Sequence, residues 1–130
     1  MSYMLTPITL SLIERLIRHS GGREVCGLVA INEREEQQFI LLRNLAEGSS
    51  SFIVDEMEMD RISRHIKSAG WRPSAFLHTH KHSAQLSGAD ITSLKTSGLP
   101  WIIVVPQASG FEVTIYWPLH SNQRGQGTNW

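Results

Sequence analysis

The sequence predicts an α/β protein in which a mixed, curved β-sheet is flanked by helices. Apolar runs of strand length alternate with segments whose apolar residues recur at helical spacing, in the order helix, two strands, helix, strand, helix, two strands. Such faces are buried most simply when helices pack on a sheet. With 130 residues, of which 41% are hydrophobic and 18% charged, the chain has the size and composition of one ordinary globular domain.

The charge balance argues against two classes of partner. Lysine plus arginine and aspartate plus glutamate number 12 each, so the formal net charge is zero, and nothing favours nucleic acid or an anionic membrane. Cys26 is the single cysteine, which rules out an intrachain disulfide framework. We find neither an apolar run of about 18 residues nor a secretory leader. A cytoplasmic protein is therefore expected.

The N-terminal segment predicts an amphipathic helix. Thr6 can cap it, and Pro7 suits the first helical position, where its missing N–H costs nothing. The glycines at 21 and 22 would end it. The expected apolar face consists of Ile8, Leu12, Ile13, Leu16 and Ile17.

A β-hairpin should follow. Residues 25–31 are a mostly apolar run that we expect to be buried on both faces, and residues 38–42 return as a second strand after a polar turn at 32–36. Residues 44–51 predict a loop, and residues 52–54 a short extended piece.

The second helix should begin with a capping box. Asp55 and Glu58 have the required spacing, and Gly70 would end the helix. Its buried face would hold Met59, Ile62, Ile66 and Ala69.

The remaining elements are predicted from the same kinds of pattern. They are a strand over 74–80, a loop over 81–86, a helix from Ser87 to about Gly98 carrying Ile91 and Leu94, and strands over 101–105 and 111–117 joined across 106–110. We expect one domain over residues 1–120, and a flexible, polar and glycine-rich tail over 121–130.

Two histidines lie at the end of the third predicted strand. His78 and His80 are two residues apart, so on a strand both imidazoles face the same side. Two neutral imidazoles and one carboxylate form the ligand set of a catalytic zinc that keeps a position open for water. Asp90 is the nearest candidate for the third ligand. The alternative is a pair of hydrogen-bonding histidines with no metal.

Two further polar features have ordinary structural interpretations. Ser87 and Asp90 have the spacing of a helix capping box, yet a helix starting beside the histidines would also place a hydroxyl and a carboxylate there. Glu24 precedes an apolar strand, where a charged residue often marks the solvent end. Beside a metal, the same carboxylate could accept a proton from water and deliver it to a leaving amine.

Together these residues resemble the metal-binding JAMM motif of the JAB/MPN domain. The motif pairs an early glutamate with His-x-His, a short loop and Ser-x-x-Asp, matched here by Glu24 before Val-Cys-Gly-Leu, by the histidine pair and by residues 87–90. Asn44, the segment 52–55 and the segment 99–104 also sit where the family has similar stretches. The resemblance covers about residues 8–117 and is strongest to compact prokaryotic and phage-tail members, without the cysteine-peptidase domain that some of these append.

The resemblance implies an MPN/JAB fold with cytidine-deaminase-like layering and zinc-dependent hydrolysis of a peptide or isopeptide bond. His78, His80 and Asp90 would bind Zn²⁺, Glu24 would act as general base and then general acid, and Ser87 would donate to the oxyanion. Zinc lowers the pKa of bound water to about 7. The substrate would be a protein or peptide, with a ubiquitin-like tail, a sulfur-carrier protein and a phage-tail precursor all open.

Two departures from the family pattern leave alternatives. Lys81 stands where members usually have proline, and six residues rather than the usual seven separate His80 from Ser87. A shortened loop could keep Asp90 from the metal, and His82 is then a possible alternative ligand. A catalytically inactive MPN-like interaction module is the alternative function. Cys26 lies in an apolar run and is interpreted as core.

Overall fold

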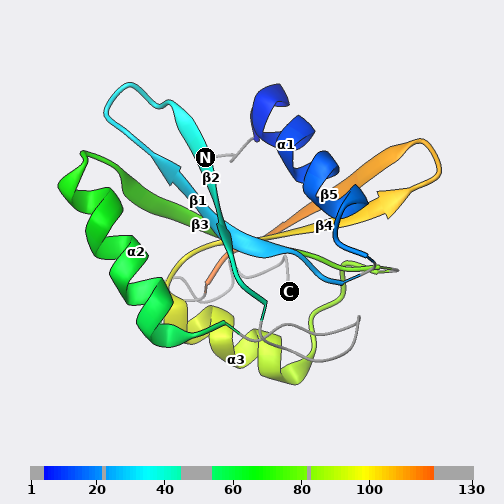
Figure 1. The fold of residues 1–130 in the computed structure, drawn as a ribbon. Helices are drawn as coiled ribbons and strands as arrows, with labels where there is room; N and C mark the ends of the chain where they lie inside the picture. The colour runs from blue at the N-terminus through cyan, green and yellow to red at the C-terminus, as the bar shows by residue number, and fades with distance from the viewer. Residues whose placement is uncertain (1–4, 22, 45–53, 82, 119–130) are drawn as a thin grey trace.

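The computed structural model describes residues 5–21, 23–44, 54–81 and 83–118. Its elements follow the predicted order (Figure 1). They are α1 (Pro7–Arg18), β1 (Cys26–Ile31), β2 (Gln37–Leu42), α2 (Glu56–Ser68), β3 (Arg72–Thr79), α3 (Gly88–Ser97), β4 (Trp101–Gln107) and β5 (Gly110–Tyr116). The predicted α/β class is confirmed.

The five strands form one mixed sheet in the order β2-β1-β3-β4-β5. β1 pairs antiparallel with both β2 and β3, β3 and β4 are parallel, and β4 and β5 are antiparallel. The parallel pair is joined through α3, because parallel neighbours need a crossover connection. The histidine strand therefore lies in the middle of the sheet, with a neighbour on each side.

Helices cover both faces of the sheet (Figure 1). We call the side under α1 the α1 face and the opposite side the α2–α3 face. The α1 face carries a core of Leu5, Ile13, Val25, Val29, Phe39, Ala75, Leu77, Ile102 and Val104. The α2–α3 face carries a second core of Cys26, Leu28, Leu42, Phe76, Leu94, Trp101, Ile103 and Val105. Successive strand residues thus alternate between two separate cores.

α1 forms as predicted, but its buried side differs from the predicted one. Thr6 caps the helix by accepting a hydrogen bond from the Thr9 N–H at 3.2 Å. Thr9 and Ile13 are buried, whereas Ile8 is 83% exposed and Leu12 39% exposed, so placing the last two on the core face was wrong. Each lies one residue, about 100° around the helix, from a buried position. The apolar residues form a band wider than the part that contacts the sheet.

α2 and α3 begin and end close to their predicted positions. Asp55 caps α2 by accepting from the Met57 N–H at 2.9 Å, and the Glu58 carboxylate accepts from the Arg43 N–H at 3.3 Å. Ala69, predicted on the buried face, is exposed at the end of α2. α3 ends at Gly98, whose φ of 69° is left-handed.

The strand boundaries shift by a few residues. β3 starts and ends earlier than predicted, leaving His80 just beyond its last residue. β4 and β5 extend toward each other, and Gln107 pairs with Gly110, so the connecting turn is shorter than the predicted 106–110. The loop predicted at 44–51 and the extended piece at 52–54 fall largely in residues 45–53, outside the described ranges, as does the predicted tail at 121–130.

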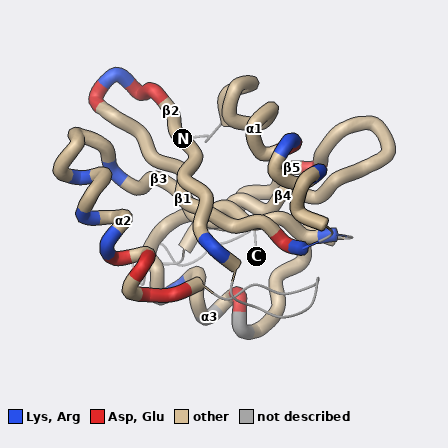
Figure 2. The backbone as a smooth tube through the Cα atoms, in the orientation of Figure 1, with Lys and Arg blue, Asp and Glu red and all other residues tan. Residues whose placement is uncertain are grey.

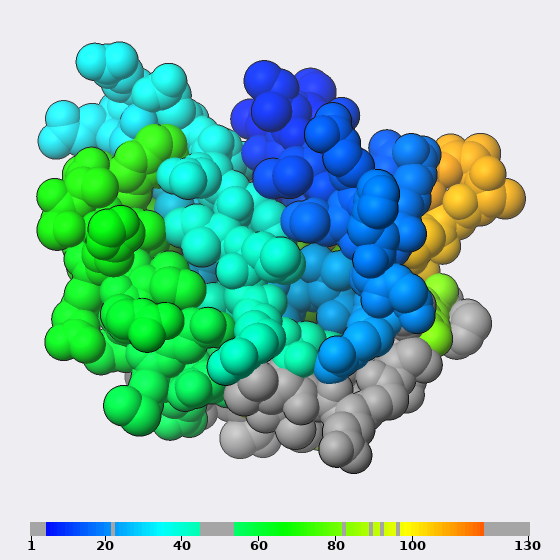
Figure 3. Space-filling model, viewed as in Figure 1, coloured from blue at the N-terminus to red at the C-terminus, as the bar shows by residue number. Residues whose placement is uncertain are grey.

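The described chain separates charge from core. Lysine, arginine and acidic residues follow α2 and the turn between β1 and β2, while the central strands carry few of them (Figure 2). In the space-filling view, α2, β2 and α1 lie side by side across one face (Figure 3). Among the described residues, no helix is long and apolar enough to cross a membrane.

Candidate metal centre

The pairing of β1 with β3 brings Glu24 to the histidines. Cys26 lies opposite His78 in this antiparallel register, so Glu24, two residues before Cys26, lies beside His80, two residues after His78. The pairing extends past the strand end, because the Thr79 N–H donates to the Val25 carbonyl at 2.9 Å. The Val25 N–H in turn donates to the Thr79 hydroxyl oxygen at 2.9 Å. Glu24 is thus held by its neighbour on the strand.

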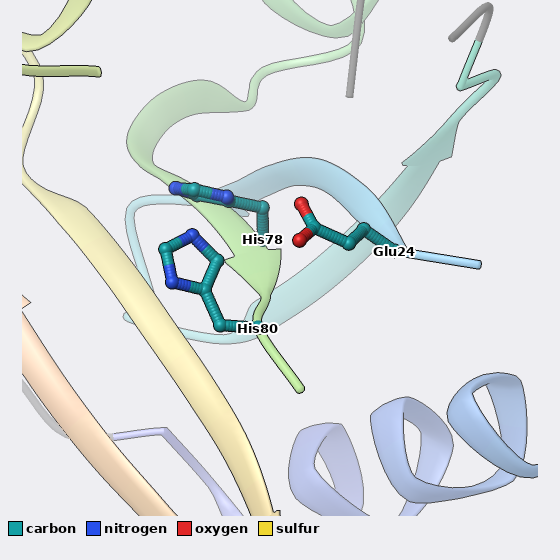
Figure 4. A group of neighbouring side chains, drawn as sticks. All are labelled: Glu24, His78 and His80. Atoms are coloured by element: carbon teal, nitrogen blue, oxygen red, sulfur yellow. The ribbon is translucent and has the colours of Figure 1, made fainter. Parts of the chain in front are cut away.

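Three side chains converge on the α2–α3 face. Glu24, His78 and His80 each offer a ligand atom, and these atoms lie within 4.8 Å of one another. The Glu24 carboxylate points toward the two imidazoles (Figure 4). Glu24 is 7% exposed and His78 fully buried. The buried carboxylate rules out the interpretation of Glu24 as a solvent-facing strand end.

The ring of His80 is oriented by the loop that follows it. Its Nδ1 lies 2.8 Å from the Ser83 carbonyl oxygen. A carbonyl only accepts, so Nδ1 carries a proton and donates; in the neutral ring Nε2 then has the free lone pair. Nε2 lies 3.9 Å from Oδ2 of Asp90. His80 is therefore in the tautomer that could bind a cation on the Asp90 side.

His78 is held among aromatic rings. Its ring packs edge-on against Trp101 at 5.0 Å and against His80 at 4.8 Å between centroids, with Phe76 at 5.8 Å. Burial, and secondarily the neighbouring His80, lower the pKa of His78 well below 6.5. The imidazole is neutral at physiological pH, which is the form that binds metal.

The charge on Glu24 is disfavoured by its surroundings. Burial raises its pKa above 4.5, and the nearby Asp90 carboxylate raises it further, while His80 and Lys81 act in the opposite direction. A carboxyl group with a raised pKa accepts and releases protons closer to neutral pH than an exposed one. Lys81 is itself exposed.

Ser87 and Asp90 form the capping box of α3. The Ser87 hydroxyl oxygen accepts from the Asp90 N–H at 3.1 Å, and Asp90 Oδ2 accepts from the Ser87 N–H at 3.1 Å. The Ser87 hydroxyl proton is not used by the first bond and can still be donated. Asp90 borders His80 but does not belong to the group of three ligand atoms. His82 lies outside the described residues.

Three supporting residues were not predicted as part of the site. Thr79 bridges to Val25 from the opposite side of the strand, the Asn44 side chain donates to the Glu24 carbonyl at 2.9 Å, and Ser83 orients His80. One signal was available for Thr79, which is a polar residue on the side of β3 where Ala75 and Leu77 are apolar. Ser83 acts through its backbone and has no such signal.

The two imidazoles of His78 and His80, with the carboxylates of Glu24 and Asp90 near them, are donors that fit a zinc ion. Imidazole nitrogens and carboxylate oxygens are its usual ligands, and two ligand atoms of a tetrahedral site at ~2.0–2.1 Å from the metal are about 3.3 Å apart. The 4.8 Å limit within the group of three and the 3.9 Å from His80 to Asp90 lie somewhat above that value. Small side-chain shifts would close the difference. Cys26 does not belong to the group of three ligand residues, and burial raises the pKa of its thiol to about 12.

Comparison with known proteins points to one family. Residues 8–118 match the family model described as prokaryotic homologs of the JAB domain. No curated protein matches the chain. A solution structure of a Desulfitobacterium hafniense protein superposes with a TM-score of 0.72 at 18% identity, covering 86% of this chain and 81% of the other. A Salinibacter ruber protein gives 0.57 at 15% identity, covering 92% and 83%. At these identities the two structures are similar in fold.

Proposed function

The chain belongs to the family of prokaryotic homologs of the JAB domain, and from that premise we propose that it is a zinc-dependent hydrolase of peptide or isopeptide bonds. One observation carries the proposal: a buried glutamate, two residues before β1, meets His78 near the end of β3 and His80 just beyond it. A buried carboxylate beside two imidazoles is costly unless it has a task or a cation to hold.

The side chains divide into holding and proton-transfer roles. His78, His80 and Asp90 would hold the metal, the first two through neutral imidazoles and the third from the first turn of α3. Zinc, when bound, supplies a hydroxide nucleophile at neutral pH and polarises the scissile carbonyl. Glu24 would take up a proton at its carboxylate and deliver it to the leaving amine, a transfer that its raised pKa favours.

Ser87 would stabilise negative charge that develops on the substrate. Its oxygen already accepts from the Asp90 N–H, which fixes the hydroxyl position and leaves its proton to donate. The N-terminus of α3 adds the positive end of its helix dipole. Removing one such donor in a comparable reaction costs about 10²–10³-fold in kcat.

The test combines zinc content with hydrolysis. Substrates would be fusion proteins whose scissile peptide or isopeptide bond follows a ubiquitin-like tail, together with free peptides. We expect about one zinc per chain, lost in His78→Ala but kept in the control His65→Ala, since His65 is exposed on α2. We expect Glu24→Gln to keep zinc and to lower kcat/KM about 10²–10⁴-fold, with Glu56→Gln, an exposed residue of α2, unchanged.

Other outcomes would redirect the proposal. Zinc-free protein from a zinc-replete preparation would favour a non-catalytic interaction module. Zinc-loaded protein in which Glu24→Gln cleaves as fast as the parent would remove Glu24 from the proton-transfer role. If zinc survives in Asp90→Asn but is lost in His82→Ala, the third ligand is His82 and not Asp90.

A further inference from the structure

A groove lies beside the candidate metal centre, between β5 and the start of α3. It has a volume of about 610 Å³ and is open to solvent along part of its surface. Glu112, Thr114 and Tyr116 of β5 form one side, and residues 83–86 with Ile91 of α3 form the other. Because the β5 residues are two apart, they share one face of the strand.

The sheet register places this groove on the same face as the histidines. His78 is level with Ile103 of β4, and Ile103 pairs with Thr114. Glu112 pairs with Val105, two residues further along β4. Each strand-to-strand step is about 4.8 Å, so β5 runs about 10 Å from β3. Three residues of extended peptide, at about 3.3 Å each, span that distance.

Residues 83–86 connect the groove to the centre. The Ser83 carbonyl accepts from His80 at 2.8 Å, and the Ala84 carbonyl accepts from the Tyr116 hydroxyl at 2.7 Å. This segment is therefore a shared wall, with the histidine on one side and β5 on the other. One carbonyl of this segment binds the histidine and the next binds the tyrosine of β5.

The lining chemistry suits a basic peptide. Among the described lining residues, Glu112 is the one acidic side chain. Burial raises the pKa of the Tyr116 phenol, and Glu112 raises it further. Leu86 and Ile91 offer apolar contact, while Gln85 and Thr114 offer hydrogen-bonding groups. The Glu112 carboxylate, together with this mixed apolar and polar lining, complements a cationic side chain on an extended peptide.

We propose that this groove is a substrate subsite that binds a lysine or arginine side chain about two to four residues from the scissile bond, with Glu112 as the specificity-determining residue. The proposal rests on the proposed hydrolytic function for the position of the bond. The binding part stands without it, because Glu112 and the groove do not depend on zinc.

The experiment measures binding and cleavage separately. Labelled decapeptides of alanine, serine and glycine would carry one lysine at each position in turn, with glutamine peptides as neutral partners. Binding to the full chain and to Glu24→Gln would be followed by fluorescence anisotropy, and mass spectrometry would report intact or cleaved peptide. We expect lysine to improve affinity about 5-fold over glutamine, and this preference to weaken at high salt.

Charge variants assign the preference to one side chain. Glu112→Gln should abolish the lysine preference, and Glu112→Lys should reverse it toward glutamate peptides. Glu56→Gln on α2 is the matched control and should leave it unchanged. A preference that survives in Glu112→Gln, equal binding of lysine and glutamine peptides, or equally strong competition by spermidine would each overturn the subsite. Lysine-selective binding without any cleavage would uphold the subsite and contradict only the proposed reaction.

Discussion

The two faces of the sheet are built from alternate residues of the same strands, yet they hold different chemistry. The α1 face is almost wholly apolar, and its buried polar strand residue, Thr79, is satisfied by the Val25 N–H. The α2–α3 face combines an apolar core with a buried glutamate and a fully buried histidine. Burying such groups is unfavourable in free energy, so their presence on this face indicates a role other than structural support.

The difference between the two faces shows that residues supporting the fold and residues of the candidate centre lie on opposite sides of the sheet. Residues of β3 that point to α1 support the sheet, and the residues between them point to the candidate centre. A substitution can therefore change the stability of the fold with little effect on the candidate centre, or the reverse, although the residues concerned are neighbours in the sequence. The predictions below test that separation through the free energy of unfolding.

The largest effect is expected on the α1 face. Ile13 is 1% exposed, so Ile13→Ala should lower the free energy of unfolding by about 2–5 kcal/mol. Ile8 lies on the same helix but is 83% exposed, so Ile8→Ala should change it by no more than about 0.5 kcal/mol. Urea unfolding measures both values. Zinc content should be unchanged in the folded fraction of each, and its loss in Ile13→Ala would show that the faces are not separable.

An intermediate effect is expected where the faces are linked. Thr79→Val keeps the side-chain shape but removes the oxygen that accepts from the buried Val25 N–H. Leaving that donor unsatisfied should cost about 1–3 kcal/mol. Since the same bond holds Glu24 beside His80, zinc affinity should fall as well, measured by competition with a chromophoric chelator. If stability falls but zinc affinity is unchanged, the hydrogen bond from the Thr79 N–H to the Val25 carbonyl is sufficient to hold Glu24 beside His80.

The smallest effect is expected from the charge on Glu24 in zinc-free protein. Because its pKa is raised in the folded state, the stabilising contribution of its proton is complete below 4.5 and is lost as pH rises through the folded value. Glu24→Gln avoids that loss. The variant should therefore unfold at a higher temperature than the parent at pH 7 to 8, with the gap closing near pH 4. Thermal unfolding with chelator present measures this, and a gap independent of pH would contradict it.

Local pattern predicted most of the fold. Helical periodicity and caps located the three helices of the described residues, and apolar runs located the strands. Both signals are local, because each depends on residues a few positions apart in the sequence. The burial of Ile8 and Leu12 was mispredicted because periodicity defines an apolar side without saying how much of it the sheet covers. The shorter β4–β5 turn depends on cross-strand pairing that extends to Gln107 and Gly110.

The candidate site was only partly readable. His78 and His80 are two residues apart, near and just beyond the end of β3, so the alternation of a strand placed them together. Glu24 joins them through the register of β1 against β3, a contact over more than 50 residues that the family resemblance supplied and local sequence did not. The contribution of Ser83 is a backbone carbonyl, and its position follows from how the loop closes onto Tyr116 through Ala84.

The reciprocal bonds between Ser87 and Asp90 have a consequence for reading related sequences. They start α3 whether or not any ion or substrate is present, so both residues would serve the same structural purpose in a related chain that has no catalytic activity. The presence of Ser-x-x-Asp in a related sequence is therefore weak evidence that the protein is an enzyme. Glu24, whose ionised form the surrounding protein disfavours, is the more informative residue to look for.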